Sequence, residues 1–182
     1  MNGILLANLL GFLSLLCYVL TLLPTTLRVV FPAAKSAKIL RLLLKHRRLV
    51  GVMSFYLALC HGFLIILKRN FDFFDVKTYG IYIQGVSTFL VFACLTITSN
   101  DWCMKKLKKN WKKLHQLTYL CMVLLTWHVW DKMSGHWSFF TPFSFIVLIS
   151  IMVLFSARKW VESQNKSSQK NIPKQTPVAV ER

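Results

Sequence analysis

The sequence predicts an all-α integral membrane protein, a bundle of about five transmembrane helices. The first observation is composition: 55% of the 182 residues are hydrophobic and the mean hydropathy is +0.50, which is too apolar for a soluble domain of this size. The second is that apolar residues gather in five uncharged stretches of 17 to 21 residues. The third is that basic residues fall almost entirely on one side of these stretches.

Each of the five stretches is long enough to cross a bilayer once. A helix rises about 1.5 Å per residue, so about 20 residues cross the roughly 30 Å hydrocarbon core. No stretch contains Asp, Glu, Lys or Arg, and the fourth is the weakest because it is short and carries two histidines. The predicted spans are residues 3–23, 49–67, 81–99, 114–130 and 139–157.

The distribution of charge predicts the orientation of the bundle. The formal net charge is +17, and 19 of the 23 Lys and Arg residues lie in the segments 24–48, 100–113 and 158–182. These three segments share one side of the predicted spans, so the positive-inside rule places them in the cytoplasm and the amino terminus outside. Nucleic acid is not an expected partner, because no folded soluble module presents these charges; the expected surroundings are the lipid bilayer.

The chain is expected to form one membrane domain, residues 1–160, followed by a disordered cytoplasmic tail, residues 161–182. The tail is polar and contains two prolines, a composition that cannot bury a core. Within the first basic connection, the stretch "AKSAKILRLLLKHRR" at residues 34–48 predicts a basic amphipathic helix on the inner membrane surface.

Histidines in the spans are the main functional signal. His61 and His128 lie about 18 and 21 Å from the inner boundary by helical rise, so they have similar depth on different helices. His46 and His115 form a second, shallower pair near that boundary. Two such imidazoles can be the axial ligands of a haem between helices, whereas one alone could simply hydrogen-bond a neighbouring helix. Because ionisable groups inside a membrane tend to be functional, we favour haem at the deeper pair.

Two stretches carry a resemblance to a known family. One is "TSNDWCMKKLKKNWKKLHQLTYLCMVLLTWHVW", with His128 thirteen residues after His115, and the other is "RRLVGVMSFYLALCH", which ends at His61. They resemble the ferric reductase-like transmembrane domain family, nearest to the haem-binding membrane subunit of the bacterial periplasmic methionine sulfoxide reductase system. The resemblance covers about residues 10–155.

This resemblance implies that His61, His115 and His128 are the haem-associated, iron-ligating histidines, and that electrons cross the membrane through b-type haem, with one haem or two. Larger relatives carry a fused flavin and nicotinamide domain after the last span. We therefore expect a separate cytoplasmic donor, a flavin reductase or flavodoxin-like protein that carries FMN. The acceptor is expected outside, for example a reductase subunit, and the location is the bacterial inner membrane.

Basic residues beside the inner boundary suggest two further roles. Arg47 and Arg48 are candidates for pairing with haem propionates, which need cationic partners. The run "KKLKKNWKK" at residues 105–113 is either only a topology signal or also a docking surface for an acidic flavoprotein.

Two other functions stay open from the sequence. A transition-metal transporter could use the histidines as ligands, although transporters more usually show intramembrane carboxylates or helices broken by Gly and Pro. A non-redox membrane anchor would only organise partners and would bind no haem. The sequence contains no recognisable substrate site, so whether the chain is itself an enzyme also stays open.

Overall fold

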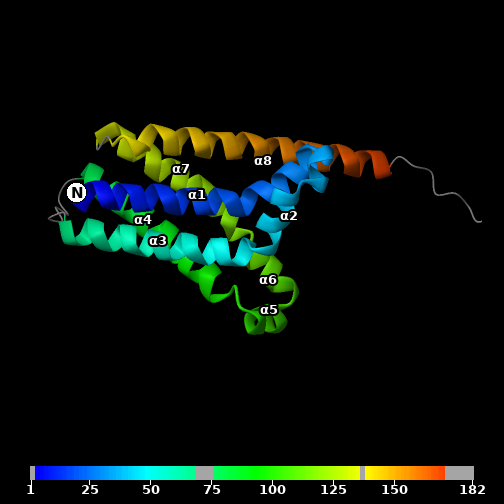
Figure 1. The fold of residues 1–182 in the computed structure, drawn as a ribbon, viewed down its shortest axis with the longest axis horizontal. Helices are drawn as coiled ribbons and strands as arrows, with labels where there is room; N and C mark the ends of the chain where they lie inside the picture. Colours follow the sequence, from blue (N-terminus) through cyan, green and yellow to red (C-terminus); the bar gives the residue numbers. More distant parts are fainter. Residues whose placement is uncertain (1–2, 69–75, 136–137, 171–182) are drawn as a thin grey trace, which may run out of the picture.

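The computed structural model describes residues 3–68, 76–135 and 138–170, nearly all of them helical. Five long helices run side by side in these residues (Figure 1): α1 (Gly3–Val30), α3 (Arg47–Lys68), α4 (Val76–Ile97), α7 (Leu117–Gly135) and α8 (Phe140–Lys170). Shorter elements lie between them: the 3-10 helix η1 (Pro32–Ser36), α2 (Lys38–Lys45), α5 (Asp101–Leu107) and α6 (Lys109–Leu114).

The all-α membrane bundle is confirmed, with four rather than five helices long and apolar enough to span a bilayer. In the described part of the chain these are Gly3–Val30, Arg47–Lys68, Tyr79–Ile97 and Phe140–Ser168. The predicted fourth span corresponds to α7, which runs beside the others but is less apolar. Its last two turns contain His128, Asp131 and Lys132, and these polar groups lower its hydropathy.

Two helices extend beyond the predicted boundaries. α1 continues through Pro24 to Val30; proline removes one backbone donor there, and the hydroxyls of Thr25 and Thr26 both donate to the Leu22 carbonyl nearby. α8 continues to Lys170, so residues 161–170, expected to be disordered, are helical. An Arg158–Glu162 ion pair of 2.7 Å at i,i+4 spacing supports this extension. Residues 171–182 lie outside the described part of the chain.

Helix α1 is central to the packing. It lies between α8 and α3 in Figure 1, and the Tyr18 hydroxyl donates to the Thr118 carbonyl at 2.6 Å, which connects α1 to the start of α7. The buried core side chains come from α1, α4, α7 and α8: Leu15, Tyr18, Val19, Leu22, Phe92, Cys121, Met122, Val129, Leu148 and Ile151.

A pair of serines fixes α1 against α3. Ser14 Oγ donates to the Ser54 carbonyl and Ser54 Oγ donates to the Ser14 carbonyl, both at 2.8 Å, and both side chains are buried. Small residues let membrane helices approach closely, and hydrogen bonds between them replace the water that lipid lacks. This contact sets the register that brings Gly11 of α1 against His61 of α3.

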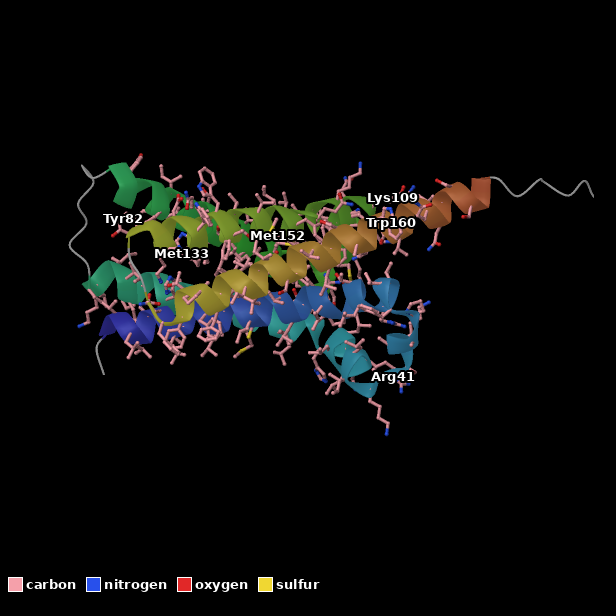
Figure 2. The ribbon with its side chains drawn as sticks, turned by 90° about the horizontal axis from the view of Figure 1, so that it is seen from above. Arg41, Tyr82, Lys109, Met133, Met152 and Trp160 are labelled. Atoms are coloured by element: carbon pink, nitrogen blue, oxygen red, sulfur yellow. The ribbon has the colours of Figure 1, made fainter. Side chains whose placement is uncertain are left out.

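The basic segments gather at one end of the bundle. Helices α2, α5 and α6 lie at the same end as the carboxyl-terminal part of α8, and the amino terminus lies at the other end (Figure 1). Figure 2 likewise shows Arg41 and Lys109 toward this basic end, and Tyr82 and Met133 toward the opposite end. The amphipathic helix predicted over residues 34–48 is present in part, as α2 (Lys38–Lys45), with η1 before it and α3 after it. The structure thus has the charge asymmetry that the topology prediction requires.

Reporter fusions test this orientation. A reporter fused after residue 75, between α3 and α4, is expected on the outer side, and one fused after residue 105, in the basic end, is expected in the cytoplasm. A fusion after residue 37, also in the basic end, is the matched control and should agree with the fusion after 105. Equal sidedness of the fusions after 75 and 105 would contradict the topology.

Candidate functional site

A cavity of about 470 Å³ within the bundle is lined by both His61 and His128. This volume falls in the range of small-molecule and cofactor sites. The imidazoles come from α3 and α7, and neither is fully buried. Much of the wall is apolar, including Leu15, Ala58, Ile65, Phe89, Phe92 and Leu125. The two histidines that the sequence places at matched depth therefore meet at one site.

The orientation of His61 is set by a backbone carbonyl of α1. His61 Nδ1 lies 2.6 Å from the Ala7 carbonyl oxygen. A carbonyl can only accept, so Nδ1 carries the proton and donates it. In a neutral imidazole the lone pair then belongs to Nε2, which is the nitrogen left for a metal.

His128 repeats this arrangement on the other side of the cavity. Its Nδ1 lies 3.2 Å from the Ile81 carbonyl oxygen of α4, so the same reasoning leaves Nε2 for coordination. One turn away, Gln84 Nε2 donates to Asp131 Oδ2 at 2.5 Å and adds a second link between α4 and α7. Gln84 Oε1 is buried without a partner among the described residues.

Each imidazole packs against a glycine. A Cβ added to Gly11 would stand 2.9 Å from His61 Nδ1, and one added to Gly85 would stand 3.3 Å from His128 Cε1. Any side chain there would take the space that the rings occupy. Together with the shared cavity and the fixed Nδ1 atoms, this arrangement supplies two imidazoles at one site, which is the donor set of a haem with two axial histidines.

A lysine that the sequence reasoning placed only in an outer connection also lines this cavity. Lys132 follows His128 by one helical turn, and its Nζ donates to Asn8 Oδ1 of α1 at 2.6 Å. Among the described residues that line the cavity, Lys132 is the only one with a formal charge. The i,i+4 spacing from His128 was the signal in the sequence, because such residues share a helix face.

Arg47 and Arg48 do not line the cavity. Arg48 Nη1 lies 2.8 Å from Asp101 Oδ1, an ion pair that joins α3 to α5. Both side chains are more than half exposed, so the pair adds little stability by itself. Arg47 lies near His115, where its charge lowers the pKa of that imidazole. Both arginines therefore belong to the basic end.

His115 lies in a turn between α6 and α7, not on a continuous helix with His128 as the sequence suggested. Its ring packs against Trp111, with centroids 4.1 Å apart and the ring planes tilted by 33°. Nε2 is buried without a partner among the described residues. Burial lowers its pKa below the usual value, Arg47 lowers it further, and the Thr98 backbone acts in the opposite direction. His46, by contrast, is exposed at the end of α2, so the predicted inner pair is unequal in burial.

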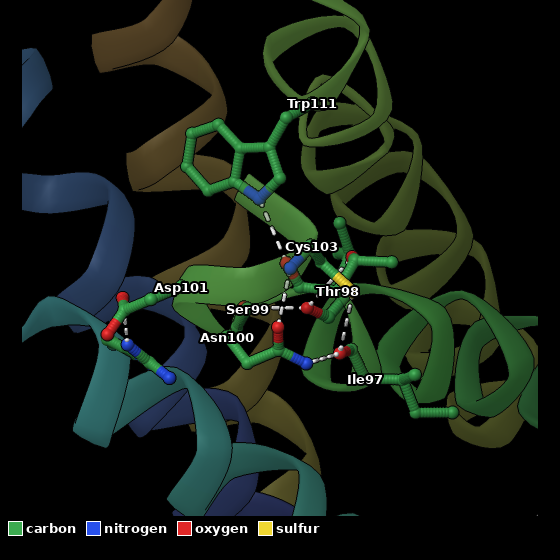
Figure 3. Close-up of polar contacts among 9 residues, drawn as sticks. Ile97, Thr98, Ser99, Asn100, Asp101, Cys103 and Trp111 are labelled. Atoms are coloured by element: carbon green, nitrogen blue, oxygen red, sulfur yellow. Dashed lines mark hydrogen bonds and ion pairs between the residues drawn. The ribbon is translucent and has the colours of Figure 1, made fainter. Parts of the chain in front are cut away.

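The lysine-rich hairpin α5–α6 is anchored to the end of α4 (Figure 3). Trp111 Nε1 donates to the Thr98 carbonyl at 2.9 Å, and the Asn100 side chain caps α5 by accepting from the Cys103 backbone at 2.7 Å. Such caps satisfy the free amides at a helix start. Because Trp111 also packs against His115, the hairpin is connected to this histidine through one side chain.

The conformation of Lys108 marks the turn of this hairpin. Its φ of 46° lies in the left-handed region, which non-glycine residues seldom adopt. The six lysines of the hairpin are exposed on either side of this turn: Lys105, Lys106, Lys108, Lys109, Lys112 and Lys113.

Residues 10–126 match the family described as ferric reductase like transmembrane component. The chain belongs to this family. It is also 29% identical over 120 residues to proteins named protein-methionine-sulfoxide reductase heme-binding subunit MsrQ from Brucella ovis, Brucella canis and Brucella suis. Each of these matches covers 63% of this chain and 51% of the relative, so the chain spans about half the length of these relatives. No solved structure matches.

The family assignment agrees with the predicted resemblance and with an integral membrane protein. The matched region contains His61 and His115, while His128 lies two residues beyond it. The assignment of His128 to the site therefore depends on the cavity and on its hydrogen bond to α4.

Proposed function

We propose that this chain is a b-type haem subunit that carries electrons across the membrane, from a separate cytoplasmic flavoprotein to an acceptor on the outer side. The observation that carries the proposal is the shared cavity, in which His61 and His128 both have Nδ1 held by a carbonyl. The names of the Brucella relatives, which are heme-binding subunits, support the same cofactor.

The residues of the cavity would have three different roles in binding a haem. Bound haem supplies a centre that exchanges one electron. His61 and His128 would fill both axial positions through Nε2, which suits electron transfer better than oxygen chemistry because no position stays open. The carbonyls of Ala7 and Ile81 would fix the ring orientations, as groups that accept the free N–H of a metal-bound histidine do. The apolar wall would exclude water.

Lys132 is a better candidate than Arg47 or Arg48 to pair with a haem carboxylate in this cavity. Its ammonium lies on the cavity wall and is oriented by Asn8, and charge-assisted hydrogen bonds of this kind are the strong ones. Arg47 and Arg48 would serve a haem at His115 if a second one is bound.

The alternatives are less well supported by the site. Among the described residues no group of three or more His, Cys, Asp and Glu side chains could hold a metal ion, and two imidazoles supply only half of a tetrahedral zinc-type site. A non-redox anchor would have no use for a cavity with two oriented histidines.

The partners follow from the two ends of the bundle. At the basic end, the α5–α6 hairpin presents exposed lysines and is connected through Trp111 to His115. A positive patch steers an acidic partner during encounter, such as a flavin reductase or flavodoxin-like protein that carries FMN. The acceptor, such as an outer reductase subunit, would meet the opposite end, and the membrane would be the bacterial inner membrane.

Ligand substitutions test the proposal. His61→Ala and His128→Ala should each lose most of the low-spin haem absorbance, because each removes one axial nitrogen. His46→Ala, at an exposed position away from the cavity, should keep the low-spin spectrum of this site. The measurement is the oxidised and reduced spectrum of purified protein whose elution matches wild type. Wild-type low-spin spectra in both ligand variants would refute the pairing.

Lys132→Gln tests the carboxylate partner. The substitution keeps a donor for Asn8 but removes the charge, so haem affinity should fall about tenfold, the equivalent of one charge-assisted hydrogen bond. The midpoint potential should also fall, because a nearby positive charge favours the reduced form. Lys68→Gln, at the exposed end of α3, is the matched control and should change neither quantity. Equal affinities and potentials in both variants would remove Lys132 from this role.

The lysine patch is tested by neutralising Lys105, Lys106, Lys108 and Lys109 to Gln. Haem reduction by a cytoplasmic flavoprotein should slow at low salt, and its salt dependence should flatten, because steering is screened over about 8 Å at physiological ionic strength. The matched control removes four exposed charges of η1 and α2 at the same end: Lys35, Lys38, Arg41 and Lys45. Rates and salt slopes equal to wild type in the hairpin variant would leave the lysines as a topology signal alone.

A further inference from the structure

We infer that Gly11 and Gly85 are positioning residues, which open a backbone carbonyl on α1 and α4 to the imidazoles of His61 and His128. This inference deepens the proposed function and rests on it for its consequence at the haem. The arrangement itself is a property of the polypeptide.

The two halves of the site share one pattern. His61 Nδ1 bonds the Ala7 carbonyl and packs on Gly11, four residues later in α1. His128 Nδ1 bonds the Ile81 carbonyl and packs on Gly85, four residues later in α4. In both halves the carbonyl acceptor therefore precedes the glycine by one helical turn.

Helix geometry explains why the glycine must follow the acceptor at this spacing. Residues i and i+4 lie on one face of a helix, one above the other. A side chain at i+4 leans toward the helix amino terminus and covers the turn that contains residue i. Glycine at i+4 leaves the carbonyl of residue i uncovered, so a ring from the neighbouring helix can reach it. Glycine destabilises a helix interior. Here that cost is offset because glycine lets the imidazole reach the carbonyl.

Not every glycine near the site has this role. A Cβ at Gly62, directly after His61, or at Gly80, directly before Ile81, would meet nothing within 4 Å. At Gly11 the added atom would lie 2.9 Å from the ring, closer than real Cβ contacts allow, and at Gly85 it would lie 3.3 Å away. An alanine at Gly11 therefore requires the His61 ring to move. An alanine at Gly85 requires a smaller displacement of the His128 ring.

These contacts determine which imidazole nitrogen is left to coordinate a ligand. With Nδ1 bound to a carbonyl, each ring keeps one tautomer and presents Nε2 to the cavity. Alanine at Gly11 displaces the His61 ring from the Ala7 carbonyl, so that the Nδ1–H tautomer is no longer favoured over the Nε2–H tautomer. Simple loss of helix packing would not alter the tautomer selectively at His61.

The first experiment reads the tautomer without haem. In full-length protein labelled with ¹⁵N-histidine and purified without haem, the ring signals of His61 and His128 should show the Nδ1–H form; each is assigned by its loss in His61→Ala or His128→Ala. Gly11→Ala should give mixed tautomers at His61, and Gly85→Ala a smaller change at His128. The controls Gly62→Ala and Gly80→Ala should match wild type. An Nε2–H form in wild type, or unchanged signals in Gly11→Ala, would overturn the inference.

The second experiment reads the bound state. In haem-loaded protein, electron paramagnetic resonance of the ferric form should show shifted low-spin g values in Gly11→Ala and smaller shifts in Gly85→Ala. The control for this experiment is Gly80→Ala, which should show no shift; Gly62 is not used because it lines the cavity. Wild-type g values in Gly11→Ala would also overturn the positioning role. If wild-type protein binds no haem, the proposed function fails, and the tautomer experiment still decides the inference.

Discussion

Hydrogen bonding between helices in an apolar interior is the constraint on which this structure depends. Polar groups there have no water to bond, so a buried polar group without a protein partner is costly. The reciprocal serine contact between α1 and α3 and the bond from Tyr18 to α7 satisfy this constraint and set the helix registers. The register of α1 against α3 brings His61 to the Ala7 carbonyl, and the bond from His128 to the Ile81 carbonyl joins α7 to α4. The geometry of the cavity is therefore a result of how the bundle satisfies its own polar groups.

The two ends of the bundle have different chemistry. The basic end combines exposed lysines with a half-buried histidine whose pKa is lowered by burial and by Arg47. Toward the opposite end, the cavity carries a single cation among its described lining residues, and Asn8 holds it in place. Under the proposed function, the basic end would meet the soluble donor and the opposite end would meet the acceptor.

The sequence predicted the long helices well because hydropathy and charge determine where a chain can cross lipid. It also predicted the depth match of His61 and His128, since depth follows from counting residues along a helix. It did not predict the turn at His115, because that break depends on hydrogen bonds to α6 and on packing against Trp111.

Other features of the site were hidden from the sequence for related reasons. The role of Gly11 depends on the register between two helices, which composition does not reveal. Lys132 was assigned to an outer connection because the charge of Asp131 ended the apolar stretch just before it, although α7 continues past both residues to Gly135. Residues 161–170 were expected to be disordered from their polarity, but a preceding long helix and a local ion pair extend the helix through them.

The optical and paramagnetic resonance spectra of the wild-type chain, purified from haem-replete cells, decide whether His61 and His128 hold a haem. We expect a Soret band, sharp α and β bands on reduction, and a low-spin ferric signal of two axial imidazoles, with about one haem for each cavity. A purified, folded chain without a Soret band, or one with only high-spin haem, would contradict it.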